Sequence, residues 1–169
     1  MSGILGLFEL ADQVAFITGG GRGIGRAIAV GFAEAGADIV AVSRTTSELE
    51  ETAKLVREKG RRCLGVSCDV TDRAQLDVAV EKAVAEFGKI DILVANAGGV
   101  FNYYPLEEMP EEEWDDQITR NLKTNFLATS AVGKVMIKQG RGKIINIGSM
   151  TSWAPRPGIA GYNAGKAGL

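Results

Sequence analysis

The feature that most constrains the fold is a regular alternation of short apolar runs with longer segments of helical periodicity. The apolar runs lie at 14–17, 39–42, 63–68, 90–95 and 143–147. Helical patterns are predicted at 24–35, 45–59, 71–87, 111–139 and 160–169. Nearly all-apolar strands are typical of a parallel sheet that helices cover on both faces. The pattern therefore predicts a doubly wound, three-layer α/β fold of the Rossmann-like kind.

The length of 169 residues predicts one domain over 1–169. The sequence ends within the last helical pattern, which leaves the strand at 143–147 as an exposed apolar edge. Such an edge favours aggregation. We therefore expect the C-terminal part of the domain, including the last strands, to be missing from this sequence.

Composition excludes several classes of protein. The formal net charge is −2, which gives no electrostatic basis for binding nucleic acid or an anionic membrane. There is no histidine, so His metal sites and Ser-His-Asp triads are excluded, and no metal is expected. Cys63 and Cys68 lie five residues apart in one predicted strand and cannot bridge each other. Free thiols, and an N-terminus without the basic start of a signal peptide, predict a cytoplasmic protein.

A glycine-rich turn, TGGGRGIG from Thr18 to Gly25, joins the first apolar run to the first helical pattern. Gly19 can take the positive φ of a sharp turn, Gly23 lets a pyrophosphate approach the backbone, and Gly25 allows close packing of helix on strand. The N–H groups at the helix start then face the phosphates. A turn at this place predicts dinucleotide binding, with a plain glycine-rich turn as the alternative.

The end of the second predicted strand favours NADP over NAD. A carboxylate there binds the ribose 2′-hydroxyl of NAD, but the residues are Ser43 and Arg44, and no acid follows before Glu48. Arg22 in the glycine turn adds a second guanidinium group. Two such groups suit a 2′-phosphate. The alternative is that both arginines are solvated and the cofactor is NAD.

Tyr162 and Lys166 lie four residues apart in the last helical pattern, so a helix places both on one face. A lone phenol exchanges protons poorly at neutral pH, but a neighbouring ammonium stabilises the phenolate. Ser149 follows the fifth strand, at the edge where such sheets bind ligands, and its hydroxyl can hydrogen-bond a substrate oxygen. A surface Tyr–Lys pair and a simple turn serine are the alternatives.

Six motifs in one order resemble the short-chain dehydrogenase/reductase family over nearly the whole chain, from about Phe8 to Leu169. They are the glycine turn, Asp69-Val70 after the third strand, Asn96-Ala97-Gly98 after the fourth, Asn121 in the long helical pattern, Ser149, and Tyr162 with Lys166. The resemblance implies an oxidoreductase that transfers a hydride between NADP(H), or alternatively NAD(H), and a carbonyl or secondary alcohol.

The resemblance also implies a role for each motif. Tyr162 becomes the general acid/base, and Lys166 makes the phenol more acidic and holds the nicotinamide ribose. Ser149 steadies the substrate oxygen, and Asn121 anchors a water in the proton relay. The residues expected to hold the cofactor are Thr18, Gly19, Gly21, Arg22, Gly23, Ile24, Gly25, Ser43, Arg44, Asp69, Val70, Asn96, Ala97, Gly98, Tyr162 and Lys166.

The resemblance does not fix the substrate. The sequence is similar in general appearance to 3-oxoacyl-carrier-protein reductases and to sugar or polyol dehydrogenases. Four aromatic residues could form an apolar wall of the cleft, or could equally be core or subunit contacts: Phe101, Tyr103, Tyr104 and Trp153. Relatives often assemble through the helices that carry Asn121 and Tyr162, so a homo-oligomer, a dimer or tetramer, is expected. Apolar residues between Leu122 and Met136 suit that interface or an ordinary core.

Other functions compete with this interpretation. A non-catalytic dinucleotide-binding sensor or regulatory protein could use the same fold, although the set Asn121, Ser149, Tyr162 and Lys166 argues against it. A P-loop NTPase is excluded, because no Gly-Lys-Ser/Thr follows the glycines. A methyltransferase would share the first strand and helix but would not explain Tyr162 and Lys166.

Overall fold

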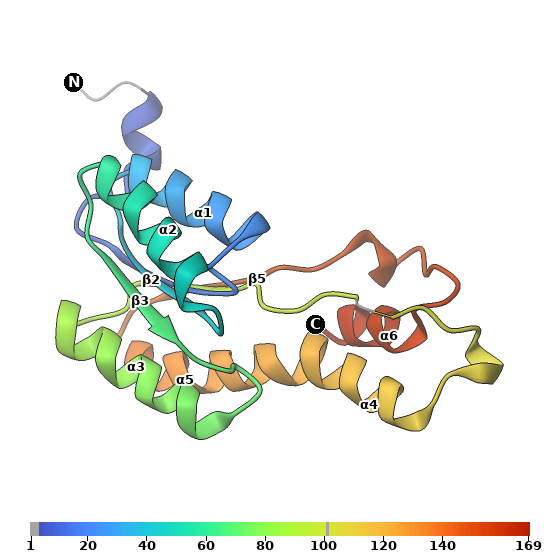
Figure 1. Ribbon diagram of the computed structural model, residues 1–169. Coiled ribbons are helices and arrows are strands. Elements are labelled where there is room, and N and C mark those ends of the chain that lie inside the picture. The colour runs from blue at the N-terminus through green and yellow to red at the C-terminus, as the bar shows by residue number, and fades with distance from the viewer. Residues whose placement is uncertain (1–3, 101) are drawn as a thin grey trace.

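A five-stranded parallel sheet forms the centre of the computed structural model, which describes residues 4–100 and 102–169 (Figure 1). Its strands are β1 (Val14–Thr18), β2 (Asp38–Ser43), β3 (Cys63–Ser67), β4 (Ile92–Ala95) and β5 (Lys143–Asn146). They lie in the order β3-β2-β1-β4-β5, and every neighbouring pair is parallel. The chain leaves β1 toward β2 on one side and returns to β4 on the other. The predicted fold class is confirmed.

Helices cover both faces of the sheet. On one face lie α1 (Gly23–Glu34) and α2 (Thr46–Glu58), and on the other α3 (Arg73–Phe87) and α5 (Thr124–Gln139) (Figure 1). The long helical pattern at 111–139 consists of α4 (Glu111–Ile118), the π-helical turn η3 (Thr119–Lys123) and α5. The remaining helices are α6 (Ala160–Gly168) and the short 3₁₀ turns η1 (Ile4–Phe8), η2 (Leu106–Glu108) and η4 (Met150–Ser152).

Successive residues of a strand point to opposite faces, and the two cores follow this rule. Val14 and Phe16 of β1 pack into the core under α3 and α5. Ala15 and Ile17 pack into the core under α1 and α2. All four side chains are 3% exposed or less. Burial on both faces explains why the strands read as continuous apolar runs.

Two helix caps and the start of the fourth strand differ from the predictions. A capping box of Thr45 and Glu48 was expected for α2, but Thr45 makes no side-chain cap hydrogen bond. The cap of α3 is Asp72 and not Thr71, because the Asp72 carboxylate accepts from the N–H groups of Ala74 and Gln75. The fourth strand begins at Ile92 and not at Ile90, and the Asp91 carboxylate before it accepts from the N–H of Val14.

Apolar residues on β5 and α5 reach the surface. β5 is an edge strand of the sheet, and Ile144 and Ile145 are 40% and 42% exposed. On α5, Leu127 and Val132 belong to the core, whereas Phe126 is 64% exposed. An ordinary core therefore accounts for Leu127 and Val132 but not for Phe126.

Within the described ranges, no helix combines the length and the apolar character that crossing a bilayer requires. Cys63 and Cys68 are both free thiols, as expected.

Candidate active site

A cleft of about 540 Å³ opens at the carboxyl edge of the sheet. Its walls come from the glycine turn, the ends of β2 and β3, the segment after β4, the residues after β5, and α6. β2 lies on one side of β1 and β4 on the other, so the direction in which strands are added to the sheet changes at β1. Open α/β sheets bind ligands at this point. Of the sixteen residues expected to hold a cofactor, fourteen line the cleft: Gly19, Gly21, Arg22, Gly23, Ile24, Ser43, Arg44, Asp69, Val70, Asn96, Ala97, Gly98, Tyr162 and Lys166.

The glycine turn has the backbone that its sequence predicted. Gly19 and Gly23 have φ angles of +66° and +54°, in the left-handed region. Gly25 does not line the cleft but packs behind it, where a Cβ would lie 2.2 Å from the Gly19 carbonyl oxygen. Around Gly23 a Cβ would meet nothing within 4 Å, so the turn faces open space there.

Thr18 also supports the cleft from outside its wall. Its hydroxyl accepts hydrogen bonds from the N–H groups of Asn96 and Ala97, each at 3.0 Å. The Asn96 amide in turn donates to the Thr18 carbonyl oxygen at 3.0 Å. These bonds join the ends of β1 and β4, so that the glycine turn and the Asn96 segment hold a fixed relative position.

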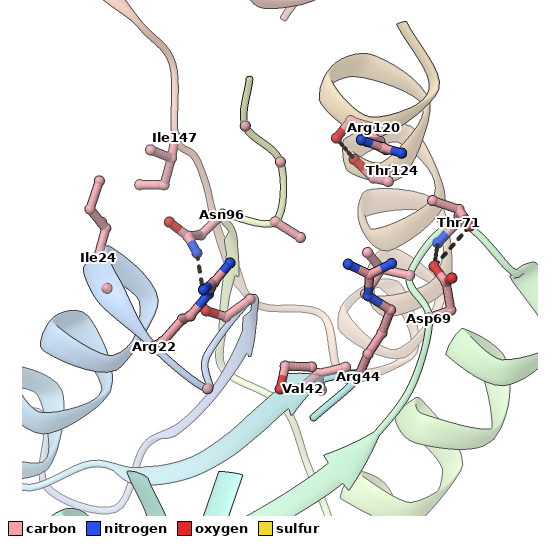
Figure 2. A pocket seen from close by; sticks show the side chains of 18 of the residues that line it. Arg22, Ile24, Val42, Arg44, Asp69, Thr71, Asn96, Arg120, Thr124 and Ile147 are labelled. Carbon is pink, nitrogen blue, oxygen red and sulfur yellow. Dashed lines mark hydrogen bonds between the residues drawn. The ribbon is translucent and has the colours of Figure 1, made fainter. Parts of the chain in front are cut away.

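Two arginines and two acids lie where the cleft meets the glycine turn and the ends of β2 and β3. Arg22 and Arg44 both point into the cleft (Figure 2). The Arg22 Nε atom lies 3.8 Å from Oε1 of Glu48, at the start of α2. Hydrogen bonds from Thr71 lower the pKa of Asp69, and the charge of Arg44 lowers it further. Each arginine therefore faces a carboxylate as well as the cleft.

Ser43 supplies a test of whether a nucleotide fits. Its hydroxyl oxygen is buried and has no hydrogen-bond partner within the described part of the chain. A buried hydroxyl without a partner is costly, and a polar ligand relieves that cost. The hydroxyl lies beside Gly21, where a Cβ would approach it to 2.6 Å. The site therefore combines a glycine backbone without side chains, the unpaired Ser43 hydroxyl and the guanidinium groups of Arg22 and Arg44. Together these groups fit a phosphorylated ribose.

A clamp that the sequence did not reveal holds the glycine turn to α2. The Arg26 guanidinium donates to the Gly21 carbonyl oxygen, to the Glu48 carbonyl oxygen and to the Thr52 hydroxyl. The Thr52 hydroxyl lies within hydrogen-bond distance of the carbonyl oxygens of Gly20, Gly21 and Glu48. Residues 26 positions apart in the sequence carry this clamp, so no local spacing could indicate it.

Tyr162 and Lys166 reach the other end of the cleft from α6. The Lys166 Nζ atom lies 5.9 Å from the centre of the Tyr162 ring, on the same helix face. It donates a 2.7 Å hydrogen bond to the carbonyl oxygen of Ile147, after β5. Lys166 is 6% exposed, and burial lowers the pKa of its ammonium. α6 thus presents a phenol and a largely buried cation to one cleft.

Asn121 lies behind the wall rather than on it. It is fully buried in η3, accepts from the Gly99 N–H at 2.8 Å, and donates to the carbonyl oxygens of Gly99 and Gln117. α6 packs against this turn through glycines. A Cβ on Gly165 would lie 3.1 Å from the Asn121 Cβ, and one on Gly161 would lie 2.8 Å from the Gln117 Cβ.

Ser149 is not among the residues that line the cleft. Its hydroxyl accepts from the Thr151 N–H at 3.2 Å and from the Thr151 hydroxyl at 3.0 Å, at the start of η4. The structure therefore gives Ser149 a capping role in the turn that follows the fifth strand.

Two of the four aromatic residues lie at the surface. Tyr103 and Trp153 are 71% and 88% exposed, which excludes the core alternative for both. Neither they nor Tyr104 line the described cleft. Phe101 lies outside the described residues.

Several cleft residues were not predicted from the sequence: Val42, Thr45, Glu48, Cys68, Thr71, Gly99, Arg120, Thr124, Ile147 and Gly148. Most directly neighbour a predicted residue, so the strand ends could have indicated them. Arg120, in η3, directly precedes the predicted Asn121, whereas Thr124, in α5, has no such signal (Figure 2). Over residues 4–100 and 102–169, no group of three or more acidic or cysteine side chains could hold a metal ion.

The strand order and the cleft at the carboxyl edge define a Rossmann-like α/β protein. The family model for short chain dehydrogenase matches residues 13–169. The chain belongs to the short-chain dehydrogenase/reductase family.

Named relatives share most of this chain. It is 44% identical over 167 residues to 2-dehydro-3-deoxy-D-gluconate 5-dehydrogenase of Dickeya dadantii (strain 3937), covering 98% of this chain and 65% of that protein. It is 39% identical over 157 residues to the 3-oxoacyl-(acyl-carrier-protein) reductase FabG of Escherichia coli (strain K12), covering 93% and 63%. The chain thus spans a little under two thirds of the length of these relatives.

A solved structure has the same arrangement. Carveol dehydrogenase from Mycobacterium avium in complex with NAD superposes with a TM-score of 0.91 and 34% identity, over 95% of this chain and 62% of that one. This similarity supports the Rossmann-like fold.

Proposed function

We propose that the full-length protein is an oxidoreductase that interconverts a carbonyl and a secondary alcohol with NADP(H), with NAD(H) as the alternative cofactor. One observation carries the proposal. Tyr162 and Lys166 line the same cleft as the glycine turn and the two arginines. A phenol next to a largely buried ammonium, in the same cleft as the glycine turn, suits proton exchange with a substrate oxygen.

Four residues of the chain would each take a different part in proton transfer and substrate binding. Tyr162 would donate a proton to the carbonyl oxygen, or accept one from the alcohol. Lys166, fixed by its bond to the Ile147 carbonyl oxygen, would stabilise the phenolate electrostatically and hold the nicotinamide ribose. Ser149 would orient the substrate oxygen. Asn121 would anchor a water in the proton relay. The cofactor, when bound, supplies or takes up the hydride.

The cofactor preference rests on Arg22 and Arg44. Both line the adenosine end of the cleft, and two guanidinium groups favour a 2′-phosphate over a hydroxyl. The structure of carveol dehydrogenase from Mycobacterium avium, which is in complex with NAD, keeps NAD as the alternative.

The substrate is a small carbonyl compound or alcohol, and no nucleic acid or membrane partner is proposed. Relatives named for acids of the sugar series and for 3-oxoacyl substrates support a polar or acyl ketone. A homo-oligomer, dimer or tetramer, is proposed, since Phe126 and Ile137 are 64% and 82% exposed on α5. A reducing, cytoplasmic location is part of the same proposal, supported by the two free thiols.

The test is Tyr162→Phe in the full-length protein. Oxidation of NADPH and of NADH is measured against ketones, aldehydes, sugars and 3-oxoacyl thioesters. Loss of the hydroxyl should lower kcat about 10²- to 10⁴-fold, with NADPH binding nearly unchanged. The matched control is Tyr103→Phe, an exposed tyrosine outside the cleft, which should keep full activity. Wild-type protein that binds NADPH tightly but turns over none of these substrates would instead favour a dinucleotide sensor.

A further inference from the structure

Glu48 is an acid at the one place in the cleft where a 2′-phosphate is expected. It lines the cleft from the first turn of α2, beside Ser43 and Gly21. A Cβ added to Gly21 would lie 3.1 Å from the Glu48 Cβ and 2.6 Å from the Ser43 hydroxyl. Glu48 and Ser43 therefore line the same part of the cleft.

The carboxylate of Glu48 faces one of the two arginines. Its Oε1 atom lies 3.8 Å from Nε of Arg22, whose side chain is 74% exposed, while that of Glu48 is 30% exposed. A 2′-phosphate that used Arg22 would have to share it with this carboxylate. Arg44, on the other side, already lies close enough to Asp69 to lower the pKa of that carboxyl.

The position of Glu48 is fixed by the glycine turn itself. The Arg26 guanidinium donates to the carbonyl oxygens of both Glu48 and Gly21. The Thr52 hydroxyl contacts the same two oxygens at 3.1 and 3.2 Å. The start of α2 is thus tied to the turn that carries Arg22, so the backbone of Glu48 cannot withdraw from Arg22 without breaking the clamp.

We propose that Glu48 is a specificity-determining residue that weakens the preference for NADP by competing with the ribose 2′-phosphate for Arg22. This inference rests on the proposed binding of a nicotinamide dinucleotide in the cleft. Glu48 makes the two arginines a weaker phosphate site than the sequence alone indicates, and it holds the difference between NADP and NAD to a modest factor.

The test separates the 2′-phosphate from the rest of the cofactor. Binding of adenosine 2′,5′-bisphosphate and of adenosine 5′-monophosphate to the full-length protein is measured by calorimetry. Glu48→Gln should tighten binding of the bisphosphate about two- to fivefold, the scale of a partly exposed ion pair, and leave the monophosphate unchanged. The control is Glu50→Gln, which removes the same charge from an exposed position of α2 and should change neither affinity.

A second background isolates the competition for Arg22. In Arg22→Gln protein, the bisphosphate should bind more weakly, and Glu48→Gln should no longer change its affinity. An unchanged bisphosphate affinity in Glu48→Gln overturns the inference. So does a change that appears only as weaker monophosphate binding, or an equal effect of Glu50→Gln.

The two proposals can fail separately. If wild-type protein binds the bisphosphate no more tightly than the monophosphate, the NADP preference is wrong. Tightening in Glu48→Gln would still establish the competition in that case. If neither nucleotide binds wild type or variant, both proposals are wrong.

Discussion

The ammonium of Lys166 lies 5.9 Å from the centre of the Tyr162 ring and donates a hydrogen bond to a carbonyl oxygen of a different segment, that of Ile147. A charge that is 6% exposed and bonded to a neutral oxygen is costly to keep. Such an arrangement is favoured where the charge has a chemical task, as proposed for the proton transfer at Tyr162.

The cost of that buried charge predicts a pH dependence of stability. Burial lowers the pKa of Lys166 in the folded protein below its ordinary value of 10.5. The unfolded chain therefore binds more protons between the lowered pKa and 10.5, so this residue makes the free energy of unfolding rise with pH across that window. Below the window the penalty is constant.

The measurement compares wild type with Lys166→Met by urea unfolding at a series of alkaline pH values. The difference in the free energy of unfolding between the two proteins should change in favour of wild type as pH rises toward 10.5. A difference that is flat over this range would contradict the burial of the charged ammonium.

Replacing Arg44 by aspartate is expected to change the cofactor preference. Arg44→Asp removes a cation from the proposed phosphate site and introduces the carboxylate that binds a ribose 2′-hydroxyl. The ratio of kcat/KM for NADPH to that for NADH should fall about tenfold or more, the scale of a lost charge-assisted hydrogen bond. Lys54→Asp makes the same charge change at an exposed position of α2 and serves as the control. An unchanged ratio in Arg44→Asp would count against NADP.

Two glycines of α1 should respond oppositely to alanine. A Cβ on Gly25 would lie 2.2 Å from a backbone oxygen of Gly19, so Gly25→Ala should destabilise the protein by about 1–3 kcal/mol or more. Around Gly31 a Cβ would meet nothing within 4 Å, so Gly31→Ala should stabilise by about 0.5–1 kcal/mol through helix propensity. Chemical denaturation measures both. Equal effects at the two positions would refute the close approach at the glycine turn.

Asn121 should contribute to the stability of the fold. Asn121→Leu leaves the N–H and carbonyl groups of Gly99 without the partner that they have now. Gly99 is half-buried, and a lost hydrogen bond costs about 0.5–1.5 kcal/mol, so a loss of about 1–3 kcal/mol in the free energy of unfolding is expected. The exposed Asn102 gives the control, since Asn102→Leu should change stability by about 0.5 kcal/mol or less. A loss below 1 kcal/mol for Asn121→Leu would show that water replaces these bonds.

The sequence predicted the sheet and most of the cleft for one physical reason. A strand buried on both faces must be apolar, and the carboxyl ends of parallel strands converge on one edge. Residues directly after the apolar runs, such as Arg44, Asp69 and Asn96, were therefore placed correctly on the cleft. Their individual roles stay predictions.

Interactions between distant segments could not be predicted in this way. Thr71 and Asp72 are both good capping residues, and only the backbone conformation selects Asp72. Glu48 has the spacing of a capping box, but its carboxylate lies near Arg22, a residue of another element. The bonds of Arg26 to the start of α2 likewise depend on how α1 and α2 pack.

The glycine contacts of α6 determine how the site tolerates change. Gly161 and Gly165 pack directly against Gln117 and Asn121, with no room for a side chain. The Tyr162 N–H donates to the Gln117 side-chain oxygen at 2.9 Å. A single added methyl group at this seam would displace the phenol, the ammonium and the buried amide together. The three groups therefore hold their positions together, and a substitution at Gly161 or Gly165 affects all of them at once.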